Sequence, residues 1–85
     1  MIYIVQGTTG EYSDRSDWLV CAYRTKEAAE TRARNAMLRA MEIKNAKPDQ
    51  YSNIPEGMKN EFDKSMSMDY TGTEYTVLEV ELLEE

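Results

Sequence analysis

Histidine is absent from this chain of 85 residues, and cysteine, tryptophan and phenylalanine occur only once each. Without histidine, the chain cannot build a triad that uses an imidazole base, nor a metal site with imidazole ligands. The single cysteine, Cys21, excludes a disulfide within one chain, and an unpaired cysteine is typical of cytosolic proteins. These absences disfavour the common hydrolase and transferase mechanisms, and we expect the protein not to be an enzyme.

Long apolar runs and excess positive charge are also lacking. No stretch approaches the roughly 18 apolar residues of a membrane span, and Met1–Val5 lack the basic segment that opens a secretory leader. With 16 acidic against 10 basic residues, the net charge is −6. This charge opposes unaided contact with nucleic-acid phosphates. The length predicts a single domain over residues 1–85, and we expect a cytoplasmic protein that binds no membrane and does not bind nucleic acid directly.

Three segments have the residue types of β-strands. Met1–Gly7 is apolar on both sides, which is typical of a central strand. Trp18–Tyr23 is rich in the same residue types, and the polar connection before it favours an antiparallel hairpin. Glu74–Leu82 alternates, so that one side of this strand carries Thr76, Leu78, Val80 and Leu82.

Between the second and third strands, the spacing of apolar residues predicts helices. Thr25 is a favourable N-cap, and alanines at 29, 33, 36 and 40 draw one stripe along a helix. Pro48 disfavours helical geometry in the residue before it, so we expect the helix to end near Asn45–Lys47. Met58, Phe62 and Met66 recur every fourth residue, which predicts a short second helix over Pro55–Ser65.

The predicted fold class is therefore α+β, with the order β-β-α-(α)-β. A small, three-stranded, mainly antiparallel sheet would have the first strand at its centre. The long helix would pack on one face of the sheet, over Leu78, Val80 and Leu82.

Charge is divided unevenly along the chain. Residues 1–47 carry eight basic and six acidic side chains, whereas residues 48–85 carry two basic and ten acidic ones. An acidic surface could select a basic partner and speed association with it. Along the long helix, Arg32 and Arg39 align on one side while Arg34 does not, which favours surface positions over a nucleic-acid patch. The acidic residues that would form the surface are Glu56, Glu61, Asp63, Asp69, Glu74, Glu79 and Glu81.

Two polar loops carry aromatic residues of the kind found at binding hot spots. Tyr12, Arg15 and Trp18 lie in or beside the first loop, and residues 69–73 form the second. A core position for Trp18 and a turn-stabilising role for Asp14 are the competing interpretations.

A metal or small-ligand site is an alternative of a different class. Glu11, Asp14, Asp17 and Asp69 could together bind Mg²⁺ or Ca²⁺ if the two loops meet. The spacing of these carboxylates does not match a calcium loop, and turn formation explains Asp14 and Asp17 more simply. We therefore expect no metal and no cofactor, and we interpret Cys21 as a small apolar filler.

Several short motifs resemble those of small uncharacterised bacteriophage and prophage proteins. The similar segments are Thr9–Arg15 (TGEYSDR), then Trp18, Val20, Ala22 and Tyr23, and later Asp69–Thr73 (DYTGT) with Tyr75. The resemblance covers most of the chain but not residues 45–65. It implies a phage accessory protein that acts in the host cytoplasm. Many phage accessory proteins inhibit host or anti-phage machinery.

We therefore expect a protein that binds a host protein or protein complex with a basic surface, as an anti-CRISPR-like or other anti-defence inhibitor. A self-associating structural protein, or a homodimer, is a further alternative. The predicted partner-binding residues are Glu11, Tyr12, Asp14, Arg15, Trp18, Glu61, Asp63, Asp69, Tyr70 and Glu74.

Overall fold

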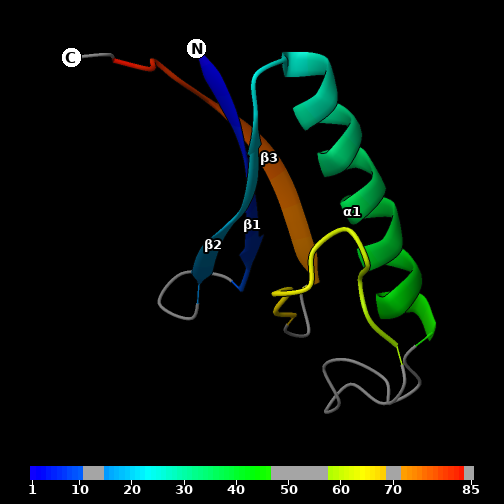
Figure 1. Cartoon of the computed structure of the whole chain (residues 1–85). Coiled ribbons are helices and arrows are strands. Elements are labelled where there is room, and N and C mark those ends of the chain that lie inside the picture. Colours follow the sequence, from blue (N-terminus) through cyan, green and yellow to red (C-terminus); the bar gives the residue numbers. More distant parts are fainter. Residues whose placement is uncertain (11–14, 47–57, 69–71, 84–85) are drawn as a thin grey trace.

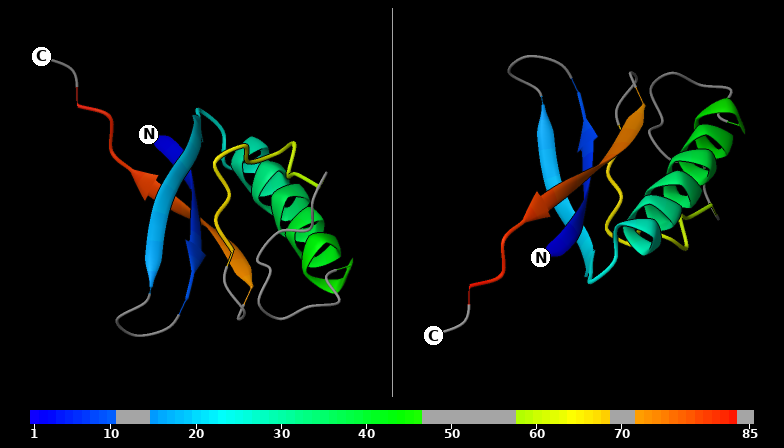
Figure 2. Two further views of the ribbon diagram at one scale, coloured as in Figure 1. Left: turned by 90° about the horizontal axis from the view of Figure 1, so that it is seen from below. Right: turned by 90° about the horizontal axis from the view of Figure 1, so that it is seen from above.

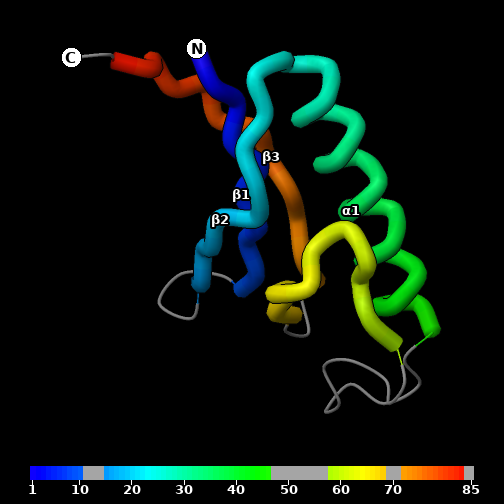
Figure 3. The backbone as a smooth tube through the Cα atoms, viewed as in Figure 1, coloured from blue at the N-terminus to red at the C-terminus, as the bar shows by residue number. Residues whose placement is uncertain are grey.

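The computed structural model describes residues 1–10, 15–46, 58–68 and 72–83. Within this part of the chain, three strands and one helix follow in the order β1 (Ile2–Thr9), β2 (Ser16–Tyr23), α1 (Lys26–Ala46) and β3 (Thr73–Val80). The helix lies beside the sheet (Figure 1), and the backbone trace follows the same path (Figure 3). The expected α+β class is confirmed.

The sheet is antiparallel, and β1 lies at its centre between β2 and β3. β1 and β3 pair without interruption from Ile2 opposite Val80 to Thr9 opposite Thr73. The pairing of β1 with β2 shifts by one residue between Val5 and Gln6, which leaves Val20 as an extra residue in β2. Such a bulge bends an edge strand and disfavours further strand pairing there.

One face of the sheet is covered by α1 together with residues 58–68. The helix lies mainly over β1 and β3. Residues 58–68 lie beside the helix on that same side and pass from it to the strands (Figure 2). No described segment lies on the other face, so the described part of the chain forms two layers.

The alanine stripe of α1 forms the helix side of the core. Ala29, Ala33, Ala36, Ala40 and Ile43 are all buried. Because alanine is small, the helix axis can approach the sheet closely, and larger side chains from the strands fill the remaining space. Those that pack against Val5, Ala29 and Ala33 are Tyr3, Val20, Cys21, Tyr23, Tyr75 and Val77.

The start of α1 follows its sequence signal. Thr25 Oγ1 accepts a hydrogen bond from the backbone N–H of Ala28 at 3.3 Å. This contact satisfies one of the amide groups that a helix N-terminus leaves without a helical partner. The predicted N-cap is confirmed.

The prediction that α1 packs over Leu78, Val80 and Leu82 is wrong. The helix packs instead on the opposite side of β3, where Tyr75 and Val77 lie against the core. Leu78 and Val80 keep 40% and 39% of their surface exposed. The aromatic rings on the Tyr75 side of the sheet fill the space that the alanine stripe leaves. The prediction considered only the alternation of aliphatic residues along β3, and this alternation does not reveal the role of the aromatic side.

The predicted second helix is also wrong in the part that is described. Residues 58–65 form turns at 61–62 and 64–65 rather than helical structure, and residues 55–57 lie outside the described part of the chain. The backbone N–H of Asp63 donates to the carbonyl of Asn60, and that of Met66 donates to the carbonyl of Asp63, both at 3.1 Å. Side-chain contacts from Asn60 and Asp63, described below, compete with a helix here.

Gly7 is required by its neighbour on β2. The indole of Trp18 lies across it, so a Cβ at position 7 would sit 2.5 Å from Trp18 Cε2. A contact this short forces the ring or the strand to move. The absence of a side chain at position 7 thus lets Trp18 lie flat over the sheet.

Replacing Gly7 by alanine should therefore lower the free energy of unfolding by about 1–3 kcal/mol. Urea unfolding of the purified variant measures this change. In a Trp18→Leu background the same Gly7→Ala change should cost less, by about 1 kcal/mol or more. Equal costs in both backgrounds would show that Trp18 does not set the requirement.

Candidate functional site

A buried carboxylate joins three separate segments on the covered face. Asp63 is only 3% exposed. Its Oδ2 accepts hydrogen bonds from Trp18 Nε1 and from the Tyr75 hydroxyl, both at 2.8 Å, and its Oδ1 accepts from the backbone N–H of Ser65 at 3.1 Å. A buried carboxylate is tolerated only when its oxygens are satisfied in this way. Asp63 therefore fixes residues 58–68 to both edge strands of the sheet.

Asn60 connects the same segment to the helix. It is 2% exposed. Its Nδ2 donates to the carbonyl of Ala36 at 3.0 Å and lies 3.4 Å from the Tyr75 hydroxyl. Its Oδ1 accepts from the backbone N–H of Phe62 at 3.0 Å. Among the described residues, no buried side-chain nitrogen or oxygen lacks a hydrogen-bond partner.

Two arginines of α1 hold the segment from outside. Arg32 Nε donates to the carbonyl of Phe62 at 2.8 Å, and its guanidinium lies 5.8 Å from the centre of the Phe62 ring. Arg39 Nε donates to the carbonyl of Lys59 at 3.1 Å and lies 3.4 Å from a carboxylate oxygen of Glu61. The alignment of Arg32 and Arg39 on one side of the helix thus serves the fold.

Because it satisfies three donors, Asp63 should be important for stability. Asp63→Asn keeps the shape of the side chain but replaces one of its two acceptor oxygens by an NH2 group, which would face a donor. We therefore expect a loss of about 1–3 kcal/mol in the free energy of unfolding. Urea unfolding followed by Trp18 fluorescence measures this loss. Glu61→Gln, a matched change at an exposed carboxylate, should alter stability by less than about 0.5 kcal/mol. Equal effects of the two changes would contradict the assigned role of Asp63.

The same network keeps Tyr75 neutral. Burial raises the pKa of the Tyr75 hydroxyl far above its ordinary value, and its hydrogen bond to the Asp63 carboxylate raises this pKa further. The unfolded chain releases the proton at the ordinary tyrosine pKa, whereas the folded chain keeps it. Tyr75 therefore stabilises the fold fully below the ordinary pKa, and this contribution is lost as the pH rises above it.

The free energy of unfolding should consequently fall as the pH rises above about 10. Urea unfolding at a series of pH values from about 8 to 11 measures the slope. Tyr75→Phe should be less stable at neutral pH but should show a flatter pH dependence. Tyr3→Phe, which changes a tyrosine outside the network, should keep the wild-type slope. A wild-type slope in Tyr75→Phe would rule out this linkage.

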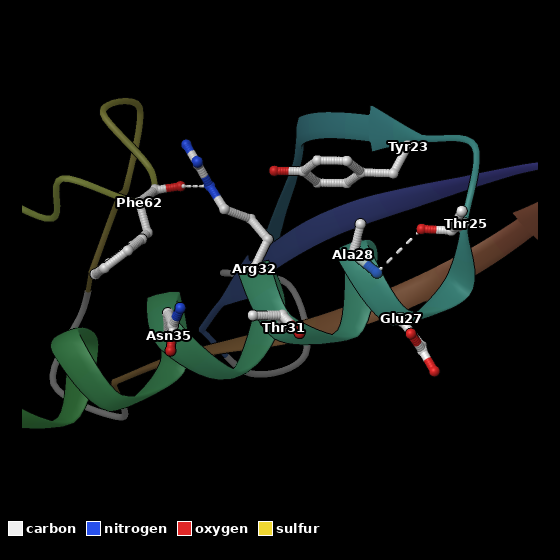
Figure 4. Close-up of a pocket in the computed structure, with 8 residues that line it drawn as sticks. All are labelled: Tyr23, Thr25, Glu27, Ala28, Thr31, Arg32, Asn35 and Phe62. Carbon is white, nitrogen blue, oxygen red and sulfur yellow. Dashed lines mark hydrogen bonds between the residues drawn. The ribbon is translucent and has the colours of Figure 1, made fainter.

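A hollow of about 510 Å³ opens beside the N-terminal half of α1 (Figure 4). In this view Arg32 reaches from the helix to the carbonyl of Phe62, and the Glu27 side chain points away from Arg32. The hydroxyl of Thr25 is engaged in capping the helix. These contacts hold the fold and do not assemble a nucleophile with a base. The residues that line the hollow are Tyr23, Thr25, Glu27, Ala28, Thr31, Arg32, Asn35 and Phe62.

The second face of the sheet has a different character. Strand pairing places Ile4 between Ala22 and Leu78, with Leu19 beside Gln6. Because neighbouring residues in a strand point to opposite faces, and Val5 points into the core, these side chains point away from α1. Leu19 is 64% exposed. We call this surface the open face, and its apolar members are Ile2, Ile4, Leu19, Ala22, Leu78 and Val80.

One end of the open face is acidic. Thr8 pairs with Asp17 on one side and with Glu74 on the other. Asp17 Oδ1 accepts from the Thr8 hydroxyl at 2.8 Å and from Arg15 Nε at 3.2 Å. The hydrogen bond from Thr8, followed by that from Arg15, lowers the pKa of Asp17 below its ordinary value. Asp17 is therefore ionised at neutral pH. We call the surface formed by Asp17 and Glu74 the acidic end.

The two predicted binding loops leave the sheet at this same end. Thr9 pairs with both Ser16 and Thr73, and its hydroxyl donates to the carbonyl of Gly72 at 2.6 Å. The described ends of the loops are thus adjacent. The loop residues Glu11, Tyr12, Asp14, Asp69 and Tyr70 lie outside the described part of the chain.

The remaining predicted partner-binding residues divide between surface and interior. Arg15, Glu61 and Glu74 are exposed. Trp18 is partly buried on the covered face, with its indole N–H bonded to Asp63. Asp63 is buried, so it forms no part of an exposed acidic surface, and changing its charge would act on the fold.

Sequence reasoning missed the apolar part of the open face as a binding surface. The signal was present, because β1 is apolar on both sides while only one long helix was predicted to cover the sheet. Of the carboxylates considered for a metal, only Asp17 lies in the described part, where Thr8 and Arg15 bind it. Among described residues, no group of three or more acidic or cysteine side chains is arranged to hold a metal.

Comparisons with family models, with curated proteins and with solved structures each give no match for this chain. The helix found in the described residues is not long and apolar enough to cross a bilayer.

Proposed function

We propose that this protein acts by binding another protein through the open face, and not by catalysis. The observation that carries the proposal is the exposure of large aliphatic side chains on a sheet face that no described segment covers. Leu19 is 64% exposed, and Leu78 and Val80 are 40% and 39% exposed. The solvated face of an antiparallel sheet normally carries polar residues, so a contiguous apolar surface there marks an interaction site.

The surroundings of the open face fit recognition of a basic partner. The acidic end adds negative charge beside the apolar surface, and the whole chain has a net charge of −6. Complementary charge would raise the association rate and reject acidic proteins. Glu74, which was assigned to binding on sequence grounds, lies at this end and would join the contact, whereas Arg15, also assigned to binding, is paired with Asp17 at 3.2 Å.

The resemblance to small phage and prophage proteins supports a more specific form of this proposal. A phage accessory protein that lacks catalytic machinery can act in the host cytoplasm by occupying a surface of a host defence component. We therefore propose an inhibitor of anti-CRISPR-like or other anti-defence type. Blocking such a surface requires only affinity and shape, which a small two-layer fold can provide.

Affinity capture from a candidate host lysate, followed by mass spectrometry, tests the assigned surface. The variant Leu19→Thr/Leu78→Thr changes two exposed residues of the open face, so it should fold normally yet lose captured partner about tenfold or more. Leu38→Thr/Met41→Thr is the matched control, since these residues of α1 are 53% and 48% exposed. Urea unfolding confirms that both variants fold.

The proposal predicts wild-type capture by the α1 control and loss of capture by the open-face variant. Wild-type capture by both variants would show that the open face is not the binding surface. Turnover of a substrate by the purified protein, abolished by changing one side chain, would overturn the binding role itself.

A further inference from the structure

The open face is large enough to bind a single helix. Three strands spaced by about 4.8 Å, each of eight residues, give a surface about 10 Å across and about 27 Å long. An α-helix is about 10–12 Å wide, and about 18 residues span 27 Å. One helix of about this length already packs on the sheet, because α1 lies along its opposite face (Figure 2).

The chemistry of the open face varies along its length. Its apolar part runs from Ile2 and Val80 through the row of Ala22, Ile4 and Leu78. The acidic end follows, beyond Gln6 and Thr76. A complementary helix therefore carries an apolar stripe along one side and basic residues toward one end.

Charge argues against a second copy of the chain as the occupant. A two-fold axis parallel to the strands would bring the apolar parts of two open faces together. The same axis would stack Asp17 of each copy over Glu74 of the other, and each copy carries a net charge of −6. Arg15 pairs with Asp17 at 3.2 Å within one chain, and Glu74 is exposed. Like charges facing each other in this way weaken association.

Taken with the proposed protein-binding function, on which this inference rests, these features identify the occupant. We propose that the open face binds a basic amphipathic helix of the partner protein, with its apolar stripe over Ile4, Leu19 and Leu78. Its Lys or Arg side chains lie against Asp17 and Glu74. The complex then has helices on both faces of the sheet.

A synthetic helical peptide of about 18 leucine and lysine residues, patterned so that one side is apolar, tests the proposal directly. Fluorescence anisotropy of the labelled peptide gives its affinity for the full-length protein. Backbone amide shifts in NMR spectra locate the contact. We expect the largest shifts at Ile4, Leu19 and Leu78, and no binding of a matched peptide with glutamate in place of lysine.

Two pairs of variants separate the apolar and charged contributions. Leu19→Thr/Leu78→Thr should weaken the peptide about tenfold or more, and Leu38→Thr/Met41→Thr should not. Asp17→Asn/Glu74→Gln should weaken it about fivefold at low salt, and less at high salt. Glu27→Gln/Glu30→Gln removes the same charge from the exposed surface of α1 and should stay within about twofold of wild type.

Several outcomes would overturn the proposal. Shifts centred on α1, equal weakening by the two charge variants, or equal binding of the glutamate peptide would each contradict a basic helix on the open face. A concentration-dependent dimer in light scattering that Leu19→Thr/Leu78→Thr abolishes would make a second copy the occupant. If a captured partner depends on the open face while the lysine peptide does not bind, the helix assignment fails and the protein-binding function stands.

Discussion

The carboxylate of Asp63 is the contact on which the arrangement of the layers depends. It receives the indole N–H of Trp18 and the hydroxyl of Tyr75, both at 2.8 Å, and so ties one irregular segment to β2 and β3 together. Asn60 extends the same contact to the backbone of α1. A carboxylate buried to this degree needs every one of these partners, so the segment has little freedom to lie elsewhere.

These contacts keep residues 58–68 on the same side of the sheet as α1. The helix and residues 58–68 share a single face, where small alanines meet large aromatic residues, and the described chain has nothing further to lay over the other face. Exposed aliphatic residues such as Leu19 are the consequence. A chain of this length gains stability by concentrating its polar network and its core on one face, and in the described residues the other face stays exposed.

Local sequence patterns were sufficient for the elements but not for the way they pack. The three strands, the long helix and the cap at Thr25 follow from residue type and spacing. The face chosen by the helix does not, because alternation along β3 made the Leu78 side look more apolar than the Tyr75 side. Asp63 was assigned to the surface because its charge suggests exposure, and its partners at positions 18 and 75 are distant in sequence. For the central part of the candidate binding surface, Ile4 and its neighbours, the sequence indicated only a strand that is apolar on both sides. It predicted no long helix for the second of these sides.

Solvent access to the two faces tests this account most directly. A soluble paramagnetic reagent broadens the methyl NMR signals of side chains that it can approach. Strong broadening is expected for the methyl groups of Ile4, Leu19 and Leu78, and protection for those of Val5 and Ile43, which are 0% exposed. Protection of the open-face methyl groups in a protein shown to be monomeric would contradict it, because some part of the chain would then already cover that face.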